Sequence, residues 1–435
     1  MSILFKFRLA STYHKELILM NSAIAVAIGL SIAIFLIYKK CLPVYALILG
    51  ALAGGLLSGW GMDSTVKAMF DGVKDITPAI VRILAAGVLT GMLVITGSAE
   101  SISRTIVTKL GRKRAYLALA LSAFILTGIG VFIDVAVITI APIALITAKE
   151  LKLSRMKVLL AMIGGGKCGN IVSPNPNTIV AAENFDAPLP SVMAAGLVPA
   201  IIGLAVTVFI ILPLIPENKG DAVTETADAG AAELPSFLAA ISGPLASVLL
   251  LALRPIFGVV VDPAVALPLG GIVGIFATRK VRCLSESLSY GLSKMSGIAV
   301  LLVGTGTIAG VIKASAVKDV LLSVISGTDS GMLLLAPASS ILMSAASAST
   351  TAGATIASAT FAQTILAGGV SAIWAAAMCN AGATVLDHLP HGSFFHATGG
   401  SVGMGFKDRL KLIPFESLIG LVLTSGVVAM AVLFS

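Results

Sequence analysis

Long apolar runs separated by short polar connections dominate the chain. The runs are continuous rather than alternating with a period of two, which is the pattern of membrane helices and not of an outer-membrane barrel. Most of them are long enough to cross about 30 Å of hydrocarbon as a helix. We therefore expect an all-α polytopic membrane protein with about ten spans, at 17–38, 42–60, 78–98, 158–182, 192–216, 235–258, 263–278, 297–312, 371–392 and 412–434.

Two of these spans contain residues that break helices. The segment IGGGKCGNIVSPNPNT, at 163–178, holds Pro174 and Pro176, which cannot donate backbone hydrogen bonds, and the consecutive glycines 164–166, which disfavour helix. Unwound backbone at membrane depth is tolerated only where protein or a water-filled cavity surrounds it. We predict broken helices at 158–182 and 371–392 that face a buried cavity, as in secondary transporters.

Two further apolar stretches are predicted to form re-entrant hairpins. The stretch 115–148 joins two basic groups, at 104–114 and 149–157, that should both be cytoplasmic, so it cannot be a single span. Gly128 and Gly130 favour a turn, and Asp134 places a carboxylate where no charge is expected. A small-residue stretch at 332–367 is predicted to form the second hairpin.

The order of span, hairpin and broken helix occurs twice, which indicates an internal repeat. An N-terminal half, 1–216, and a C-terminal half, 235–435, are joined by an acidic linker at 217–234 that is predicted to be cytoplasmic. Five spans between equivalent elements make the two copies inverted. Three residue pairs hold the same place in this order at nearly constant separations: Gly97 and Gly306, Asp134 and Ser347, and Asn175 and Asp387.

Composition supports a membrane protein and argues against other classes. Hydrophobic residues make up 57% of the 435 residues and charged residues 11%, and the mean hydropathy is +1.03. The net charge of +8 is interpreted as membrane topology rather than nucleic-acid binding, because the basic residues lie in short connections. The four cysteines lack the spacing of a disulfide framework or a metal site. The glycine-rich segments at 164–167 and 304–309 lack the strand context of phosphate- or dinucleotide-binding loops, so we predict no enzyme, no metal and no cofactor.

Polar side chains near the predicted breaks and hairpin tips are the candidate site residues. The candidates for solute binding are Lys167, Asn170, Ser173, Asn175, Asn177, Ser347, Ser349, Thr350 and Thr351, and those for ion coupling are Asp134, Asp387 and His388. Each has a structural alternative. Lys167 could bind a substrate carboxylate or neutralise Asp134 or Asp387. Serine and threonine hydroxyls in membrane helices often bond only to a carbonyl of the preceding turn.

The segments FIDVAVITIAPIAL, SPNPNTIVAA, SASTTAGATIA and LDHLPHGSFF resemble the gluconate permease family of the ion transporter superfamily. The resemblance covers nearly the whole chain. It implies an inverted repeat with two hairpins, a homodimer, and proton-linked uptake of gluconate or related sugar acids. It also implies that Asp134 is the acidic residue of the first hairpin. The chain departs from the family pattern at Asn175, where the family has histidine, at the added Lys167, and at Asp387, where the family has serine.

These observations predict a secondary active transporter in the inner (cytoplasmic) membrane. It would import a small hydroxylated carboxylate by proton symport, with Asp134 binding the proton with help from Asp387 or His388. The alternative within the class is sodium coupling through serine, threonine and asparagine oxygens and unwound carbonyls. A channel or an intramembrane enzyme is the alternative outside it. The expected partners are a small organic acid, the lipid bilayer and a second copy of the chain.

Overall fold

The computed structural model describes residues 21–111, 114–215, 233–317, 320 and 329–434, and all regular secondary structure in these ranges is helical. Five helices in this part of the chain are long and apolar enough to cross a membrane. They occupy Asn21–Tyr38, Met62–Ile95, Leu189–Leu214, Val281–Ala314 and Phe406–Phe434. Shorter apolar helices pack around them.

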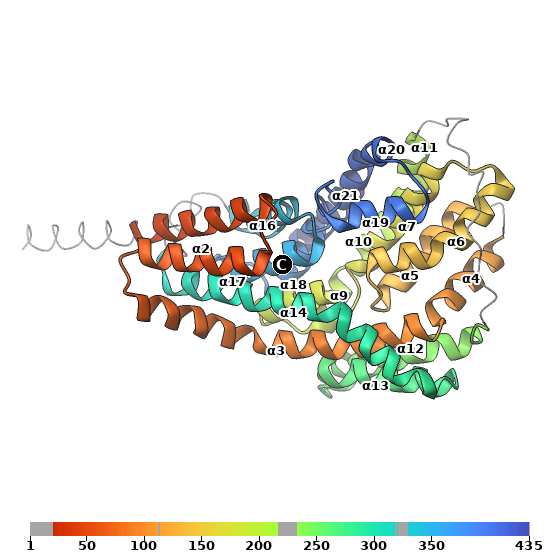
Figure 1. The fold of residues 1–435 in the computed structure, drawn as a ribbon, viewed down its shortest axis with the longest axis horizontal. Helices are drawn as coiled ribbons and strands as arrows, with labels where there is room; N and C mark the ends of the chain where they lie inside the picture. Colours follow the sequence, from red (N-terminus) through yellow and green to blue (C-terminus); the bar gives the residue numbers. More distant parts are fainter. Residues whose placement is uncertain (1–20, 112–113, 216–232, 318–319, 321–328, 435) are drawn as a thin grey trace, which may run out of the picture.

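Helices α3 (Met62–Ile95) and α14 (Leu284–Ala314) run side by side along the long dimension of the molecule (Figure 1). Gly72 of α3 lies against Gly306 and Gly310 of α14, whereas Gly91 lies against Ser287, so the two helices are antiparallel. A Cβ atom on Gly72 or Gly91 would collide with the facing backbone. Small residues at these positions allow the close approach of the two helices.

Two pairs of shorter helices flank this central pair. Gly29, in the helix Asn21–Tyr38, lies against Gly50 of α2 (Pro43–Leu57). Gly243 of α12 (Phe237–Phe257) lies against Gly270 of α13 (Pro263–Ala277) in the same way. A short 3-10 turn, Val281–Cys283, connects α13 to α14.

Both central helices are longer than the hydrophobic pattern predicts. The sequence places a polar connection at 61–77 and the next span at 78–98, but α3 is helical from Met62 and continues through Pro78. Asp71 and Lys74 face outward there, while Gly72 and Ile76 are buried at helical spacing. A search for uniformly apolar segments misses such an amphipathic helix. For the same reason α14 begins 13 residues before the predicted span at 297–312.

The two stretches predicted as hairpins are pairs of helices that pack on each other. The first pair is α5 (Ala115–Gly128) and α6 (Ile133–Leu151), which follows α4 (Ser98–Leu110). The second is α16 (Asp329–Ser347) and α17 (Thr350–Ala367), joined by Ala348 with φ +46° and by the N-cap residue Ser349. The two pairs extend from the middle of the molecule toward opposite ends of its long axis (Figure 1).

Both segments predicted as broken helices contain an interruption. Helix α7 (Arg155–Asn170) ends before Pro174, and α8 (Pro176–Asn184) begins with Asn175 as its N-cap. The predicted effect of the glycines 164–166 was wrong, because they lie inside α7. A Cβ atom on Gly165 would collide with the carbonyl oxygen of Ala120, so close packing on α5 explains the glycine there. In the second segment α18 (Ala372–Gly382) is followed by a non-helical stretch up to α19 (Ser393–Ser401).

The remaining helices close each half of the chain. They are α9 (Leu189–Ala195), α10 (Leu197–Val206), a π-helical turn (Thr207–Ile211), α11 (Leu212–Leu214), α20 (Phe406–Leu410) and α21 (Ile413–Phe434). The predicted acidic linker, 217–234, falls almost entirely outside the described residues. Arg409 is buried on α20 and paired with Glu416 of α21.

The three residue pairs proposed as equivalent are not all equivalent in the structure. Asn175 and Asp387 both lie in helix interruptions, as predicted. Gly97, however, follows the end of α3 with φ +72°, whereas Gly306 lies inside α14. Asp134 is in the first turn of α6, whereas Ser347 is the last residue of α16. A constant separation in the sequence therefore does not identify equivalent positions when the connecting segments differ in length.

Candidate functional site

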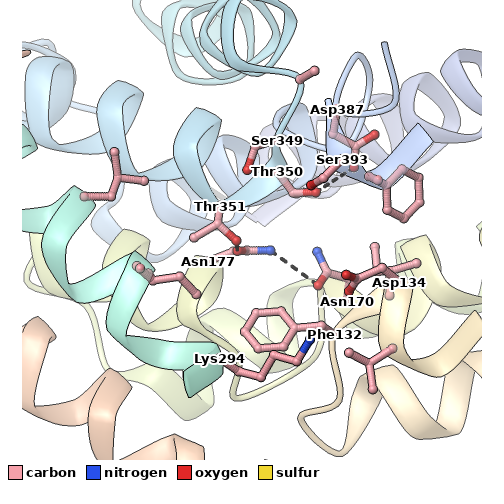
Figure 2. Close-up of a pocket in the computed structure, with 17 residues that line it drawn as sticks. Phe132, Asp134, Asn170, Asn177, Lys294, Ser349, Thr350, Thr351, Asp387 and Ser393 are labelled. Carbon is pink, nitrogen blue, oxygen red and sulfur yellow. Dashed lines mark hydrogen bonds between the residues drawn. The ribbon is translucent and has the colours of Figure 1, made fainter. Parts of the chain in front are cut away.

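A cavity of about 320 Å³ lies where the tips of both helix pairs meet the interruption of the first broken helix (Figure 2). Its polar lining comes from the first turn of α6, the end of α7, the start of α8, the start of α17, the stretch after α18, the start of α19, and α14. These residues are Asp134, Asn170, Asn177, Ser349, Thr350, Thr351, Asp387, Ser393 and Lys294. Phe132, Ile298 and Leu301 contribute apolar surface. A polar cavity between interrupted helices is suited to bind a small solute.

Hydrogen bonds between amides fix the interruption of the first broken helix. Asn175 Nδ2 donates to Asn170 Oδ1 at 2.6 Å, and its own Oδ1 accepts from the backbone N–H of Thr178 at 3.1 Å, as an N-cap. Asn177 Nδ2 donates to Asn170 Oδ1 at 3.3 Å, and Asn177 Oδ1 accepts from the hydroxyl of Thr351 at 2.6 Å. Asn170 Nδ2 has no hydrogen-bond partner among the described residues. Asn170 therefore has a buried, unpaired amide donor beside the cavity.

Lys167 lies behind the cavity and satisfies a cluster of acceptors beyond the end of α18. Its side chain is 0% exposed, and Nζ is 2.5 Å from Asp387 Oδ1. The same ammonium donates to the backbone carbonyl of Thr384 and lies 3.1 Å from His388 Nδ1. Three acceptors thus surround a group that has three hydrogens to donate. Asp387 Oδ2 faces the cavity and accepts from the hydroxyl of Thr350 at 2.6 Å.

His388 has hydrogen-bond partners on both ring nitrogens in either protonation state. Nε2 is 3.1 Å from the backbone carbonyl of Ile413, so it carries a hydrogen and donates it. In the neutral ring Nδ1 accepts from Lys167. In the doubly protonated ring Nδ1 donates to Asp387 Oδ1, which lies 3.1 Å away.

A second buried ion pair lies next to this cluster. Arg409 Nη2 donates to Glu416 Oε2 at 3.1 Å, and the guanidinium lies 4.8 Å from the ring centroid of Phe395. Glu416 Oε2 is 4.0 Å from His388 Nδ1. Sequence reasoning missed this pair, because a basic loop and an isolated glutamate at the start of an apolar run give no signal that they pair.

The structure divides the predicted site residues into two groups. Seven line the cavity: Asp134, Asn170, Asn177, Ser349, Thr350, Thr351 and Asp387. Five do not line it: Lys167, Ser173, Asn175, Ser347 and His388. Of the second group, Asn175 caps α8 and Ser347 donates to the carbonyl of Met343 at 2.7 Å, which are the structural alternatives.

Lys294, Ser393 and Phe132 line the cavity but were not predicted as site residues. Lys294 lies in the first half of α14, in a part of the helix that precedes the predicted span at 297–312. Once α14 is known to begin at Leu284, a single lysine three residues before the apolar run can be recognised as a candidate site residue.

A half-buried ion-pair cluster lies away from this cavity. Arg82 of α3 pairs with Glu183 at the end of α8, and its Nη2 donates to Asp262 Oδ2 at 2.7 Å in the loop before α13. The hydrogen bond from Arg82 is the main reason that the pKa of Asp262 lies below its ordinary value of 3.8. The Asp262 carboxyl is therefore ionised throughout the physiological pH range.

Apolar helices of membrane-spanning length around a polar cavity define a multi-pass membrane transporter. The chain belongs to the family described as GntP family permease, whose sequence profile matches residues 21–434. The family consists of permeases and not enzymes.

Relatives of known name agree with this assignment. The chain is 54% identical over 405 residues to an uncharacterized transporter of Haemophilus influenzae, covering 93% of this chain and 96% of that protein. It is 24% identical over 444 residues to a high-affinity gluconate transporter of Escherichia coli, covering 93% and 99%. The fold is similar to the crystal structure of the Alcanivorax borkumensis YdaH transporter, with a TM-score of 0.56, 15% identity, and coverage of 85% of this chain and 87% of that chain.

Proposed function

We propose that this protein is a secondary active transporter that imports a small hydroxylated carboxylate, gluconate or a related sugar acid, by proton symport. The observation that carries this proposal is the lining of the cavity, where neutral amides and hydroxyls occur together with two carboxyl groups. Amides and hydroxyls both donate and accept hydrogen bonds, so they are suited to the hydroxyl groups of a sugar acid. The similarity to named gluconate transporters supports the same class of substrate.

Asp134 is the proposed proton-binding residue. It lies half-buried at the cavity wall and makes no hydrogen bond or ion pair to another described side chain. Asp387, by contrast, is held by Lys167 and Thr350. A carboxyl group without a fixed partner can gain and lose a proton without breaking the surrounding structure. Asp387 and His388 form the proposed secondary proton site behind it.

Sodium coupling is the second candidate, and one observation favours it. Ser173 Oγ and Asn380 Oδ1 are buried near the interruption of the first broken helix and have no hydrogen-bond partner among the described residues. Neutral oxygens and unwound carbonyls are the ligands that transporters offer to sodium. The described residues contain no group of three or more histidine, cysteine, aspartate and glutamate side chains placed to hold a metal ion.

The proposed architecture has ten spans, two re-entrant hairpins and an inverted repeat. The order of two apolar helices, a long helix, a helix pair and a broken helix occurs twice. The matching glycine contacts Gly29–Gly50 and Gly243–Gly270 support this repeat. We place the protein in the inner membrane as a homodimer, as the family resemblance implies.

Uptake into proteoliposomes tests the function. Labelled gluconate and other sugar acids are offered under a pH gradient alone and under a sodium gradient alone. We expect accumulation of a sugar acid under an inward proton gradient without sodium. Accumulation that requires sodium would mean that sodium, not the proton, is the coupling ion. Uptake that stops at equilibrium under both gradients would indicate a channel or facilitator.

Replacement of Asp134 tests the proton site. Asp134→Asn keeps the shape of the side chain but mimics a permanently protonated carboxyl. Coupling requires that the protonated and ionised states differ in solute affinity. We therefore expect the variant to bind and exchange solute across the membrane but to lose accumulation against a gradient. If the variant still concentrates solute in response to a pH gradient, another residue carries the proton.

A further inference from the structure

The charged groups that line the cavity differ in whether a group of opposite charge lies beside them. In the described part of the chain these groups are Asp134, Lys294 and Asp387. Asp387 is neutralised from behind by Lys167, with 2.5 Å between Nζ and Oδ1. Lys294 has no carboxylate within 4.0 Å in the described ranges, and its only charge-related contact there is with the ring of Tyr290, 5.5 Å from Nζ. The cavity therefore holds one unpaired ammonium group.

Lys294 also reaches the cavity from a different part of the fold. It belongs to α14, whereas the amides and hydroxyls come from the helix pairs and broken helices. Figure 2 shows Lys294 extending toward Phe132, on the side of the cavity opposite Thr350 and Asp387. A solute between them would meet an unpaired cation at one end, and hydroxyls and amides together with the Lys167-paired carboxylate of Asp387 at the other. A hydroxylated carboxylate has this polarity.

We propose that Lys294 is the residue that binds the carboxylate group of the solute. This proposal rests on the proposed function and deepens it, because it assigns the anionic end of the substrate to α14. The hydroxyl-bearing end then faces Asn170, Asn177 and Thr351. Lys167 is fully buried and engaged with three acceptors, so it has no hydrogen left for a substrate.

Asp134 connects this site to proton binding. The ionisable groups facing it are Lys294 and Tyr290 on α14 and Asp387 after α18, the last with Lys167 and His388 behind it. An ionised Asp134 repels a carboxylate held at Lys294 in the same cavity, and a protonated Asp134 does not. Binding of the solute anion and of the proton therefore favour each other. Affinity for the anion should fall as pH rises.

Binding measurements on the purified full-length chain test the role of Lys294. The probes are gluconate, the non-hydroxylated anion butyrate, and the neutral polyol glucitol, each titrated by calorimetry. Lys294→Gln should weaken gluconate binding roughly ten- to hundred-fold, the range for losing a hydrogen bond to a charged group, and should leave glucitol binding unchanged. Lys313→Gln is the matched control, since Lys313 lies on the same helix but pairs with Asp75 at 2.7 Å outside the cavity.

A charge-restoration experiment separates the ammonium from a packing role. Lys294→Cys should bind gluconate as weakly as Lys294→Gln, and attachment of an aminoethyl group to the thiol should restore binding. Attachment of a neutral group of similar size should not. Gluconate should also slow the labelling of the cysteine. Gluconate affinity in Lys294→Gln within about two-fold of wild type, or equal losses for gluconate and glucitol, would overturn the proposal.

The outcomes distinguish this proposal from the proposed function. If the wild type binds butyrate as tightly as gluconate, the hydroxylated substrate is wrong, and butyrate then tests Lys294 in the same variants. If the wild type transports gluconate and Lys294→Gln does so equally well, only the role of Lys294 is wrong. If the wild type binds neither anion, the carboxylate site itself is overturned.

Discussion

Removing the Lys167 ammonium should destabilise the protein more than removing both partners of its ion pair. Asp387 is 2% exposed and retains only its contacts with Thr350 and His388 when Lys167 is replaced by methionine. Breaking a buried ion pair from one side costs about 3–5 kcal/mol, because the remaining charge is uncompensated. That is a large share of the about 5–15 kcal/mol by which folded proteins are typically stable.

The double variant Lys167→Met with Asp387→Asn should recover most of this loss. It contains no buried charge at this position, and the main remaining cost is the carbonyl of Thr384, which loses its donor at about 1–3 kcal/mol. The free energy of unfolding is measured by denaturant titration in mixed micelles, as a double-mutant cycle. Lys411→Met serves as the control, since Lys411 pairs with Asp408 at 2.7 Å on the surface, where such pairs contribute about 0–1 kcal/mol.

Two results would refute this reasoning. If Lys167→Met unfolds with the free energy of the wild type, the ion pair does not stabilise the fold. If the double variant is less stable than the single variant, Asp387 is not left uncompensated by the loss of Lys167. A Lys167→Met protein that is fully stable but no longer binds gluconate would assign Lys167 to the solute instead.

Three further predictions concern packing, pH and topology. Gly165→Ala should lower the thermal stability by overpacking α5 against α7. Gly400→Ala is the control and should not lower it, because the space around Gly400 is open. A Gly165→Ala protein as stable as the wild type would contradict the close contact. The ion pair of Asp262 stabilises the protein fully above the ordinary pKa of 3.8, and this stabilisation is lost only as pH falls through the lowered pKa. Asp262→Asn should therefore leave the ratio of uptake at acidic and neutral pH unchanged. An altered ratio would make Asp262 a proton site. Single cysteines at Thr108 and Lys152, both exposed, should be labelled from the same side of the membrane, and labelling from opposite sides would exclude the first re-entrant hairpin.

Much of the helix layout could be predicted because proline and small residues leave clear signals in an apolar sequence. Pro174 and Pro176 fixed the interruption after α7, since neither can donate within a helix. The glycines 164–166 misled the prediction, because the energetic penalty of glycine in a helix is smaller than the gain from packing α7 closely on α5. The low helix propensity of glycine therefore predicted the wrong structure at 164–166, where contacts between helices determine the conformation.

Site residues could be predicted where a polar residue occurs within an apolar stretch of sequence. They could not be predicted where polar and apolar residues alternate in the flanking sequence. Asp134 and Asn170 were found because no polar group is expected there. Lys294 was missed because it lies in an amphipathic stretch, where lysine is ordinary. The pairing of Arg409 with Glu416 depends on how α20 is oriented relative to α21, which no local pattern contains.

The two helix pairs meet the cavity with different chemistry, and this difference suggests how a repeated fold can couple two solutes. The second pair begins α17 with Thr350 and Thr351, whose hydroxyls donate to Asp387 and Asn177 and so join this tip to both broken helices. The first pair begins α6 with Asp134, which has no such bond to the described residues. Neutral, hydrogen-bonded groups can hold the solute without changing charge, while the unbonded carboxyl is free to change protonation. In the proposed function, the repeat supplies two similar positions, and we propose solute binding at one and proton binding at the other.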